Sequence, residues 1–272
     1  MRKDEHTSTI DVGQSYQKQS QTWQSLDSYG NVTEQRQYGY DSLTTPARTY
    51  QYAYLNSTDY VNRYVRNRLT GATLTAGGVT KTLRTMTYDV YTGTSCVGGG
   101  PPTYYTNAMT DASGIRHHDS TYNTSYTYRG NVQQVTQFGE MVSCANYDTA
   151  GNVIRTFTLG GPEMTETSYT TATNFVAPSA LTPNRTTELT TTLDYNAFLG
   201  VTQQTSPNSV VSTFSYDSIG RPSTVTKPDG EVIWQNYTLS PPTLTWASQT
   251  DQITHGYTYF DGFGRVIRNE VH

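Results

Sequence analysis

The chain has 272 residues, of which 15% are charged and 12% are aromatic, with 23 Tyr, 22 Gly and a formal net charge of −4. Intrinsic disorder is excluded because disordered chains of low hydropathy carry a high net charge and few aromatic residues. The balance of 18 Lys and Arg against 22 Asp and Glu offers no basic excess for nucleic-acid binding, and no apolar run approaches the roughly 18 residues of a membrane-spanning helix.

Composition favours strands over helices along the whole chain. Thr, Tyr and Val suit a pleated, half-buried surface and are well represented, whereas the helix formers Lys, Glu and Ala are sparse. The start of the chain, Met1 to His6, has no apolar segment behind it, so no signal peptide is visible. The chain is therefore expected to be an internal piece of a longer protein or to be exported by another route.

Residues 1–25 precede the first copy of a repeated motif and include a Gln-rich stretch, Ser15 to Trp23. We predict that they form an N-terminal lead-in, either a strand or an assembly segment. Residues 26–272 are predicted to form a second region, an array of repeats.

A motif of an aromatic residue or Leu, an acid, two spacers and a glycine recurs through residues 26–272. Its clearest copies are Leu26–Val32, Tyr147–Val153, Tyr216–Arg221 and Phe260–Val266, and weaker copies are Tyr88–Gly93, Asp111–Gly114, Tyr128–Val132 and Tyr195–Gly200. Most of the motif glycines are separated by near-multiples of about 21 residues, which indicates tandem structural repeats. The predicted turn positions are Asp27, Gly30, Tyr88, Asp89, Gly93, Asp111, Gly114, Tyr128, Gly130, Tyr147, Asp148, Gly151, Tyr195, Gly200, Tyr216, Asp217, Gly220, Arg221, Asp261, Gly264 and Arg265.

The spacing within the motif predicts a tight reversal of the chain. Asp at the first position of a turn caps backbone amides two residues further on, and Gly three residues later accepts the left-handed conformation that closes a hairpin. Two strands of about seven to eight residues and two turns fill a period of about 21 residues. The predicted fold is therefore all-β: tandem hairpins that form one long curved or spiral antiparallel sheet, as a partial shell, a tube or a solenoid.

Tyrosines alternate with smaller residues beside several motifs, as in Tyr50, Tyr52 and Tyr54. Residues at i and i+2 share one face of a strand, so each set lines one face of the sheet. We predict that these rings stack on their counterparts one repeat away and form cross-strand ladders. The alternative is that they form an aromatic platform for a polar, uncharged ligand such as a sugar.

A few segments depart from the motif. Residues 59–69 also fit one short amphipathic helix, and residues 69–88 read as a hairpin with Gly77 and Gly78 at its tip. Gly and Pro predict loops between repeats at 98–102, 177–183 and 241–242.

Two cysteines, Cys96 and Cys144, are too few for a disulfide framework and too far apart for a zinc ribbon. Their sequence context leaves two alternatives open, one disulfide bridge between them or two unrelated buried thiols.

No motif of an enzyme or a cofactor site is present in the sequence. His117, His118 and Asp119 form the densest metal-like cluster. Neighbouring residues on a strand point to opposite faces, so a solvated hairpin is favoured over a metal site. The motif Asp residues are assigned to turns by their spacing to Gly, not to acid–base catalysis. We predict no catalytic residue, no metal and no cofactor.

The Tyr-Asp-x-x-Gly-Arg and Tyr-Asp-x-x-Gly-Asn-Val motifs resemble the YD repeats of bacterial Rhs proteins, of shell-forming subunits of insecticidal toxin complexes and of teneurins. The resemblance covers Leu26 to His272. It implies β-hairpins that join side by side into a sheet spiralling into a hollow shell. In the toxin members that shell encloses a C-terminal toxin, in teneurins a similar barrel takes part in adhesion, and some members are described as carbohydrate-binding. An extracellular or cell-surface location is implied too.

Two features of the full-length family are not carried over. The conserved segment with autoproteolytic aspartates and the toxin that follows it have no counterpart up to His272. Roughly 25 strands about 4.8 Å apart would make a strip of about 120 Å, and closed into a ring it would be about 38 Å across. We expect that one such chain cannot enclose a folded enzyme, so it joins flanking repeats of a longer chain or further copies end to end.

The sequence thus predicts a non-enzymatic structural protein, an extracellular scaffold, shell or self-assembling fibre. The alternative is a carbohydrate-binding surface or adhesion module. A third hypothesis is a fragment of an Rhs-type shell whose toxin lies outside this chain. The expected partners are copies of the chain, flanking repeats or glycans, without nucleic acid and without a membrane span.

Overall fold

The computed structural model describes residues 2–40, 42–93, 107–158, 164–184, 186–239, 242–249 and 253–272. Across these residues the chain forms nineteen β-strands, one short α-helix and four single-turn 3-10 helices. The all-β prediction is confirmed. No helix in this part of the chain is long and apolar enough to cross a membrane.

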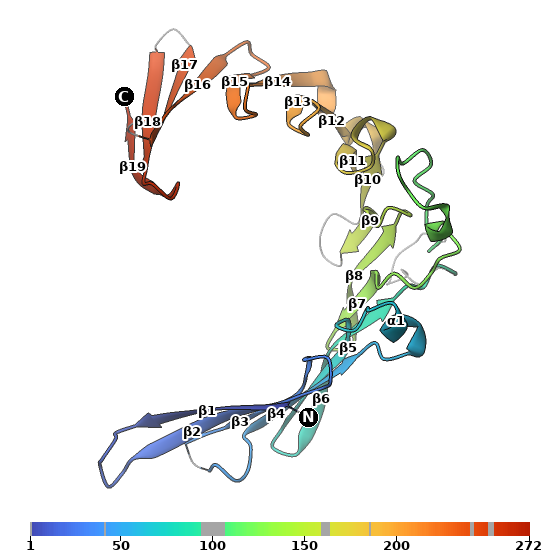
Figure 1. The fold of residues 1–272 in the computed structure, drawn as a ribbon, viewed down its shortest axis with the longest axis vertical. Coiled ribbons are helices and arrows are strands. Elements are labelled where there is room, and N and C mark those ends of the chain that lie inside the picture. The colour runs from blue at the N-terminus through green and yellow to red at the C-terminus, as the bar shows by residue number, and fades with distance from the viewer. Residues whose placement is uncertain are drawn as a thin grey trace. The chain divides into compact units, whose positions relative to one another are not determined.

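The chain divides into two compact units, and unit 1 comprises residues 1–113 and 117–164. Its strands, blue to yellow-green in Figure 1, are β1 (Arg2–Ile10), β2 (Lys18–Leu26), β3 (Val32–Tyr38), β4 (Arg48–Tyr54), β5 (Leu69–Ala76), β6 (Val79–Tyr88), β7 (Val132–Gln137), β8 (Glu140–Tyr147) and β9 (Val153–Thr158). Each strand pairs antiparallel with the next along the chain. The helical turns of unit 1 are α1 (Thr58–Asn62) and η1 (Ser120–Tyr122).

Unit 2 comprises residues 114–116 and 165–272. Its strands are β10 (Thr165–Tyr169), β11 (Pro178–Pro183), β12 (Thr191–Tyr195), β13 (Val201–Ser206), β14 (Val210–Tyr216), β15 (Pro222–Thr226), β16 (Val232–Leu239), β17 (Pro242–Gln249), β18 (Ile253–Phe260) and β19 (Val266–Val271). Each again pairs antiparallel with the next. Its 3-10 turns are η2 (Thr171–Thr173), η3 (Thr187–Leu189) and η4 (Pro207–Ser209).

One of the predicted loops is a strand. Residues 177–183 were expected to form a loop because of their prolines, yet β11 occupies most of this range and pairs with β10 and β12. Pro178 is tolerated because it lies where the register of the β10–β11 pair shifts, so it need not donate to a regular ladder. Of the loop predicted at 241–242, Pro242 is the first residue of β17 and Pro241 lies outside the described residues. The predicted loop at 98–102 lies outside the described residues.

The other local predictions are met in part. Gly77 and Gly78 form the two-residue turn of the β5–β6 hairpin, with Ala76 opposite Val79, as predicted. The helix expected within 59–69 is confirmed only as the five-residue α1. The N-terminal residues contribute the β1–β2 hairpin, and β2 pairs directly with β3. A boundary at residue 25 stays a prediction.

Few side chains are buried, because each unit is largely a single layer of strands. The buried apolar side chains are Tyr60, Ala72, Met109, Ala112, Val135, Cys144 and Met164, all in unit 1. Buried polar side chains in unit 2 are Thr173, Thr243 and Ser248. Apolar burial is the main favourable contribution in most globular folds, so here the backbone ladders and the contacts between turns have to supply more of the stability.

Candidate functional site: the turn edge and Asp89

The same turn recurs at one end of the strands in each unit. We call each five-residue segment that forms it a tip, and the end of the strands where the tips lie the turn edge. The tips are residues 27–31, 148–152, 196–200, 217–221 and 261–265. In each, the backbone N–H of the first residue donates to the carbonyl of the fifth, at 2.8–3.0 Å. The first side chain, an Asp or Asn, accepts a backbone N–H from the third or the fifth residue, or from both.

The side chain of the fifth residue completes most tips. Asn31 donates from its amide to Asp27, and Arg221 and Arg265 donate from Nε to Asp217 and Asp261. At Asp217 and Asp261 the backbone hydrogen bond from this Arg is the largest influence, and it holds the pKa of the carboxyl below its ordinary value. At Asp27 burial opposes ionisation, but the hydrogen bonds from Asn31 and Tyr29 outweigh it and lower the pKa.

The fourth residue of each tip requires a left-handed backbone. Gly30, Gly151, Gly220 and Gly264 have φ between +78° and +90°, which only glycine adopts without a steric penalty.

Tip 196–200 departs from the prediction, which assigned the turn glycine to Gly200. Leu199 has φ of +61° and occupies the glycine position, while Gly200 is the fifth residue. A Cβ on Gly200 would lie 2.6 Å from the Tyr216 ring. Gly200 is therefore needed for packing and not for turn conformation.

The residue that precedes each tip, which is aromatic except for Leu26, lies at a β-bulge. The register shifts at Leu26, Tyr54, Tyr88, Tyr147, Tyr169, Tyr195, Tyr216 and Phe260, each the last residue of its strand. In five cases the tyrosine hydroxyl donates to the carbonyl of the residue that begins the returning strand of the preceding hairpin. The pairs are Tyr54 to Val32, Tyr88 to Leu69, Tyr147 to Val132, Tyr195 to Pro178 and Tyr216 to Val201, at 2.7–3.0 Å.

The predicted tyrosine ladders stay a prediction. The ring pairs given for the described residues include Tyr60 with Tyr128 and Tyr257 with Tyr259. In the five hairpins above, the tyrosine hydroxyl ties one hairpin to the one before it. Burial accordingly raises the pKa of Tyr54, Tyr88, Tyr147 and Tyr195.

Two motif copies that the sequence suggested as separate turns are the two halves of one tip. Tyr88 pairs with Val132, so β6 is followed in the sheet by β7 and not by a strand after Gly93. The Asp89 N–H donates to the Asn131 carbonyl, and Asn131 N–H donates back to the Asp89 carboxylate, both as in an uninterrupted tip. Residues 90–128 are thus inserted into a tip made of Asp89 and residues 129–131. Neither Gly93 nor Tyr128 closes a hairpin of its own.

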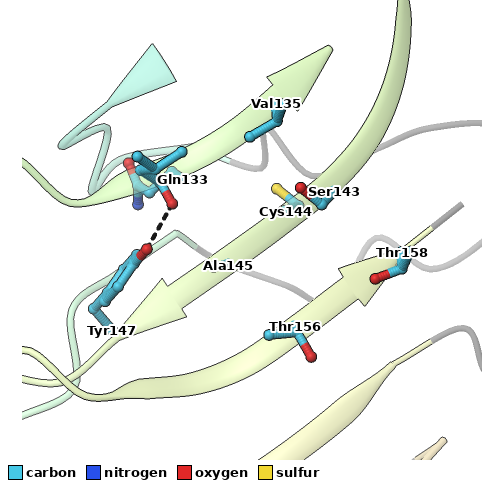
Figure 2. Close-up of a pocket in the computed structure, with 9 residues that line it drawn as sticks. Gln133, Val135, Ser143, Cys144, Ala145, Tyr147, Thr156 and Thr158 are labelled. Carbon is cyan, nitrogen blue, oxygen red and sulfur yellow. Dashed lines mark hydrogen bonds between the residues drawn. The ribbon is translucent and has the colours of Figure 1, made fainter. Parts of the chain in front are cut away.

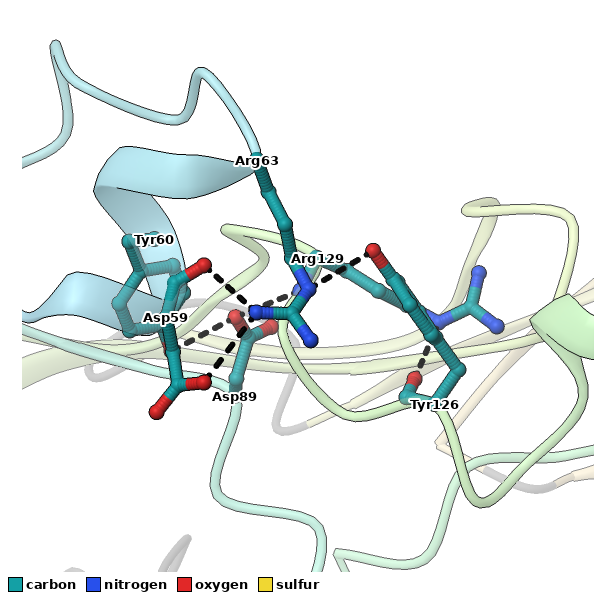
Figure 3. A network of polar contacts seen from close by, with 6 residues as sticks. All are labelled: Asp59, Tyr60, Arg63, Asp89, Tyr126 and Arg129. Atoms are coloured by element: carbon teal, nitrogen blue, oxygen red, sulfur yellow. Dashed lines mark hydrogen bonds and ion pairs between the residues drawn. The ribbon is translucent and has the colours of Figure 1, made fainter.

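The Asp89 carboxylate is the centre of this interrupted tip (Figure 3). It accepts backbone N–H groups of Arg129, Gly130 and Asn131 at 2.6–2.9 Å. The hydroxyl groups of Tyr60 and Tyr91 donate to it at 2.9 and 2.8 Å. A carboxylate has about four lone-pair sites, so five donors saturate it. Asp89 is a structural acceptor with no capacity left to act as a general base.

Arg129 connects the insertion to the next tip. Its guanidinium donates to the carbonyls of Tyr122, Asn123, Tyr126 and Thr149. The first three belong to the insertion, whereas Thr149 lies in tip 148–152. One side chain therefore holds both segments at the turn edge.

A second part of the insertion also packs on tip 148–152. Thr110 N–H donates to the Tyr147 carbonyl, and Thr149 N–H donates to the Thr110 carbonyl. Thr149 Oγ1 accepts the Ala112 N–H and donates to the Asp111 carboxylate. The prediction that Asp111 and Gly114 form a hairpin turn is wrong, because Asp111 is used as a partner of a neighbouring tip. Gly114 has φ of +88° but no paired strands flank it.

Residues 55–68 form another enlarged tip, which the motif search missed because Leu55 stands where the motif has its acid and the segment has no glycine. Leu55 N–H donates to the Arg68 carbonyl, and Tyr54 pairs with Leu69, as in other tips. Within it, Arg63 donates to Asp59 and to the Tyr126 hydroxyl (Figure 3). Arg68 Nε donates to the Gly130 carbonyl. The only sequence signal was the apolar spacing that suggested a helix.

The remaining predicted site residues carry no chemistry that the structure describes. His118 contacts the Tyr122 carbonyl and Asp119 caps η1, while His117 has φ of +58°. Among the described residues no group of three His, Cys, Asp or Glu side chains could hold a metal ion. Cys144 is 3% exposed. Cys96 lies outside the described residues, so the disulfide stays a prediction.

A cavity of about 240 Å³ lies over β7, β8 and β9 (Figure 2). Its lining residues are Val132, Gln133, Val135, Ser143, Cys144, Ala145, Tyr147, Thr156 and Thr158, all uncharged. It was not predicted from the sequence, because its residues come from three strands and share no local pattern.

A family model described as RHS Repeat matches residues 195–232, a range that holds two uninterrupted tips and the intervening strands. The match shows an RHS repeat in residues 195–232. Tips of the same geometry lie outside that range. The resemblance drawn from its motifs is confirmed.

Solved structures support the all-β fold of this chain. One titled TcdB2-TccC3 is similar with a TM-score of 0.56 and 15% identity, and it covers 94% of this chain and 18% of that one. A second, titled TcdB2-TccC3-Cdc42, gives a TM-score of 0.50 and 14% identity over 98% of this chain and 13% of that one. The chain thus spans less than a fifth of either structure. A search of curated proteins finds no match.

Proposed function

We propose that this RHS-repeat chain is a non-enzymatic wall segment, part of a larger secreted or cell-surface shell. The observation that carries the proposal is the tyrosine hydroxyl that ties a hairpin to the preceding one, which is found five times in the described residues. A contact repeated in five hairpins serves to hold a long sheet in register. The saturated Asp89 carboxylate and the similarity to a chain more than five times as long support the same role.

The wall segment is continued by strand pairing at its free edges. Among the described residues of unit 1, β1 pairs with β2 alone, and in unit 2 β19 pairs with β18 alone. Unpaired strand edges are templates for another strand. The continuing strand comes from flanking repeats of a longer chain or from a further copy of this chain. Pairing with further copies would produce a self-assembling fibre. Glycan binding stays the alternative prediction.

The register of β19 identifies which backbone groups face its free edge. His272 and His255 exchange both backbone hydrogen bonds, so residues 270 and 268 also bond to β18, whereas Asn269 and Val271 point their N–H groups away from it. Proline at Asn269 would remove one outward donor and leave the β18–β19 ladder intact. Proline at Arg268 would break that ladder.

Sedimentation velocity over a range of concentrations tests edge pairing. The parent chain is expected to associate as concentration rises, and Asn269→Pro is expected to shift it toward the monomer with little change in melting temperature. Arg268→Pro serves as the matched control that lowers the melting temperature. A parent chain that stays monomeric at the highest concentration would sink the idea that these edges pair with further copies.

A further inference from the structure

Gln133 is exceptional among the described residues because its buried amide has no hydrogen-bond partner. The side chain is 1% exposed, and neither Nε2 nor Oε1 is paired. Burying an unpaired amide disfavours folding, and native proteins seldom tolerate it. A purely structural role would be met by an apolar residue at this position, as Val135 shows two residues further along the same strand.

The strand register places Gln133 in the cavity over β7, β8 and β9. Val135 lies opposite Ser143, and Ser143 lies opposite Thr158, so these three side chains share one face of the sheet. Gln133 is two residues from Val135 and therefore lies on that face too. Ala145 and Thr156 form the next row across β8 and β9. Figure 2 shows these side chains around the cavity.

The cavity favours a neutral ligand. The nine lining residues that the structure describes are all uncharged, so a charged group would lose hydration without gaining a counter-charge from them. The Tyr147 hydroxyl already donates to the Val132 carbonyl at 2.7 Å (Figure 2), which leaves mainly its ring for a ligand. Thr156 and Thr158 are exposed and Ser143 is half-buried, so hydroxyl groups lie toward the opening and the Gln133 amide lies deep.

The Gln133 amide determines the ligand class more narrowly. A carboxamide presents an N–H donor and a carbonyl acceptor side by side in one plane, and a second primary carboxamide matches both with two hydrogen bonds. A pair of adjacent hydroxyls on a sugar could also match them. The depth of Gln133 favours a slender terminal group over a ring.

We propose that the cavity over β7, β8 and β9 binds a primary carboxamide, which pairs with Gln133 while Ser143, Thr156 and Thr158 contact the atoms that carry it. This binding site goes beyond the structural role proposed above and does not depend on it. The carboxamide is either that of a small free amide or an Asn or Gln side chain of a polypeptide.

The whole ¹⁵N-labelled chain is titrated with acetamide and with the capped peptide Gly-Gln-Gly, followed by NMR of Gln side-chain NH2 groups. The Gln133 signals are assigned by their loss in Gln133→Met. Both amide probes are expected to shift them, whereas acetate and capped Gly-Glu-Gly, which lack the donor and carry a charge, are not. A shift by acetamide alone indicates a free amide as the ligand, and a shift by the peptide alone indicates a polypeptide side chain.

Matched variants separate binding from folding. Gln133→Met is expected to weaken probe binding at least tenfold, with a melting temperature equal to or above that of the parent. Gln134→Met retains binding, because Gln134 lies between Gln133 and Val135 on β7 and so faces the opposite side of the sheet. If Gln133→Met does not fold, Ala145→Leu is used instead. Its larger side chain fills the cavity from β8, and it is expected to weaken probe binding by the same factor. The proposal is overturned if neither amide probe shifts Gln133, if glucose shifts it where amides do not, or if Gln133→Met binds as the parent does.

Discussion

At the scale of single residues, the motif acid and the motif tyrosine hold different parts of the hairpin. Asp217 closes its own tip by accepting two backbone N–H groups and the Arg221 side chain. Tyr216 acts over a distance, because its hydroxyl reaches the Val201 carbonyl in the preceding hairpin. The acid thus fixes the turn and the tyrosine fixes the relation between neighbouring hairpins.

Acid should weaken the chain through its motif aspartates. Hydrogen bonds lower the folded-state pKa of Asp27, Asp217 and Asp261 below the ordinary 3.8. A lowered pKa contributes stability that is present above the unfolded-state pKa and is lost as pH falls through the folded-state pKa. We expect the melting temperature of the parent, measured by circular dichroism, to decrease once the pH is lowered below about 4.

The control for acid sensitivity is the triple variant Asp27→Asn, Asp217→Asn and Asp261→Asn. Asn keeps the acceptor oxygen that closes the turn, as Asn196 does naturally, but it does not titrate. The triple variant should therefore be less stable at neutral pH and lose less on acidification. An equal loss in parent and variant would show that other groups govern the acid response.

Removing one motif hydroxyl should destabilise unit 1. Tyr147→Phe leaves the Val132 carbonyl, which accepts from Tyr147 at 2.7 Å, without this donor at the bulge. The expected loss of unfolding free energy is about 1–2 kcal/mol, measured by urea denaturation. Tyr64→Phe is the control, because Tyr64 is 79% exposed and should change stability by less than about 0.5 kcal/mol. Equal losses of stability in Tyr147→Phe and Tyr64→Phe would show that the Tyr147 hydroxyl does not stabilise the fold.

At the scale of elements, tips accept insertions without losing their closing bonds. The segment 90–128 separates Asp89 from Arg129, yet Asp89 still receives the backbone N–H groups of residues 129–131. Contacts within the turn edge then hold the inserted residues, mainly through Arg129 and Thr149. An enlarged tip can therefore vary while the strands that flank it keep their register.

Excising the insertion should restore an ordinary tip. A chain in which a single Ser replaces residues 90–128 would read Tyr-Asp-Ser-Arg-Gly-Asn-Val through Tyr88 to Val132. We expect it to fold with a lower unfolding midpoint, because the packing of Met109 and Ala112 is lost, and with β7 amides still protected from hydrogen exchange. The same excision combined with Asp89→Ala should lose that protection. Unprotected β7 amides in both variants would contradict the interrupted tip.

Local features of the fold could be predicted from the sequence, and non-local ones could not. The tips at Asp27, Asp217 and Asp261 were predictable because an Asp and a Gly three residues apart determine a turn between themselves. The partner of Tyr147 was not, because the Val132 carbonyl carries no side-chain signal and lies one hairpin earlier. The joining of Asp89 to Asn131 was missed because a motif search assumes that a motif is contiguous.

At the scale of the whole molecule, every described hairpin flanked by a tip uses the same bulge, whether or not its tip is enlarged. The sequence suggested roughly 25 strands, at about one strand per ten or eleven residues, whereas nineteen strands are found in the described residues. The difference arises partly because residues 55–68 form an enlarged tip and because the strands on either side of residues 90–128 pair directly with each other. Within each unit the sheet is thus built from hairpins whose turns can be enlarged, which is the central claim of this account.

A disulfide trap between β6 and β7 tests that claim most directly. Thr85 lies opposite Thr136, and their hydroxyl groups are hydrogen-bonded. In Thr85→Cys/Thr136→Cys, mild oxidation should form a bond between these positions, which peptide mapping by mass spectrometry would identify. The slipped pair Thr85→Cys/Gln137→Cys should not form one, because a shift of one residue points the side chain to the other face. A bond in the slipped pair, or none at 85 and 136, would contradict the wall built from interrupted and uninterrupted tips alike.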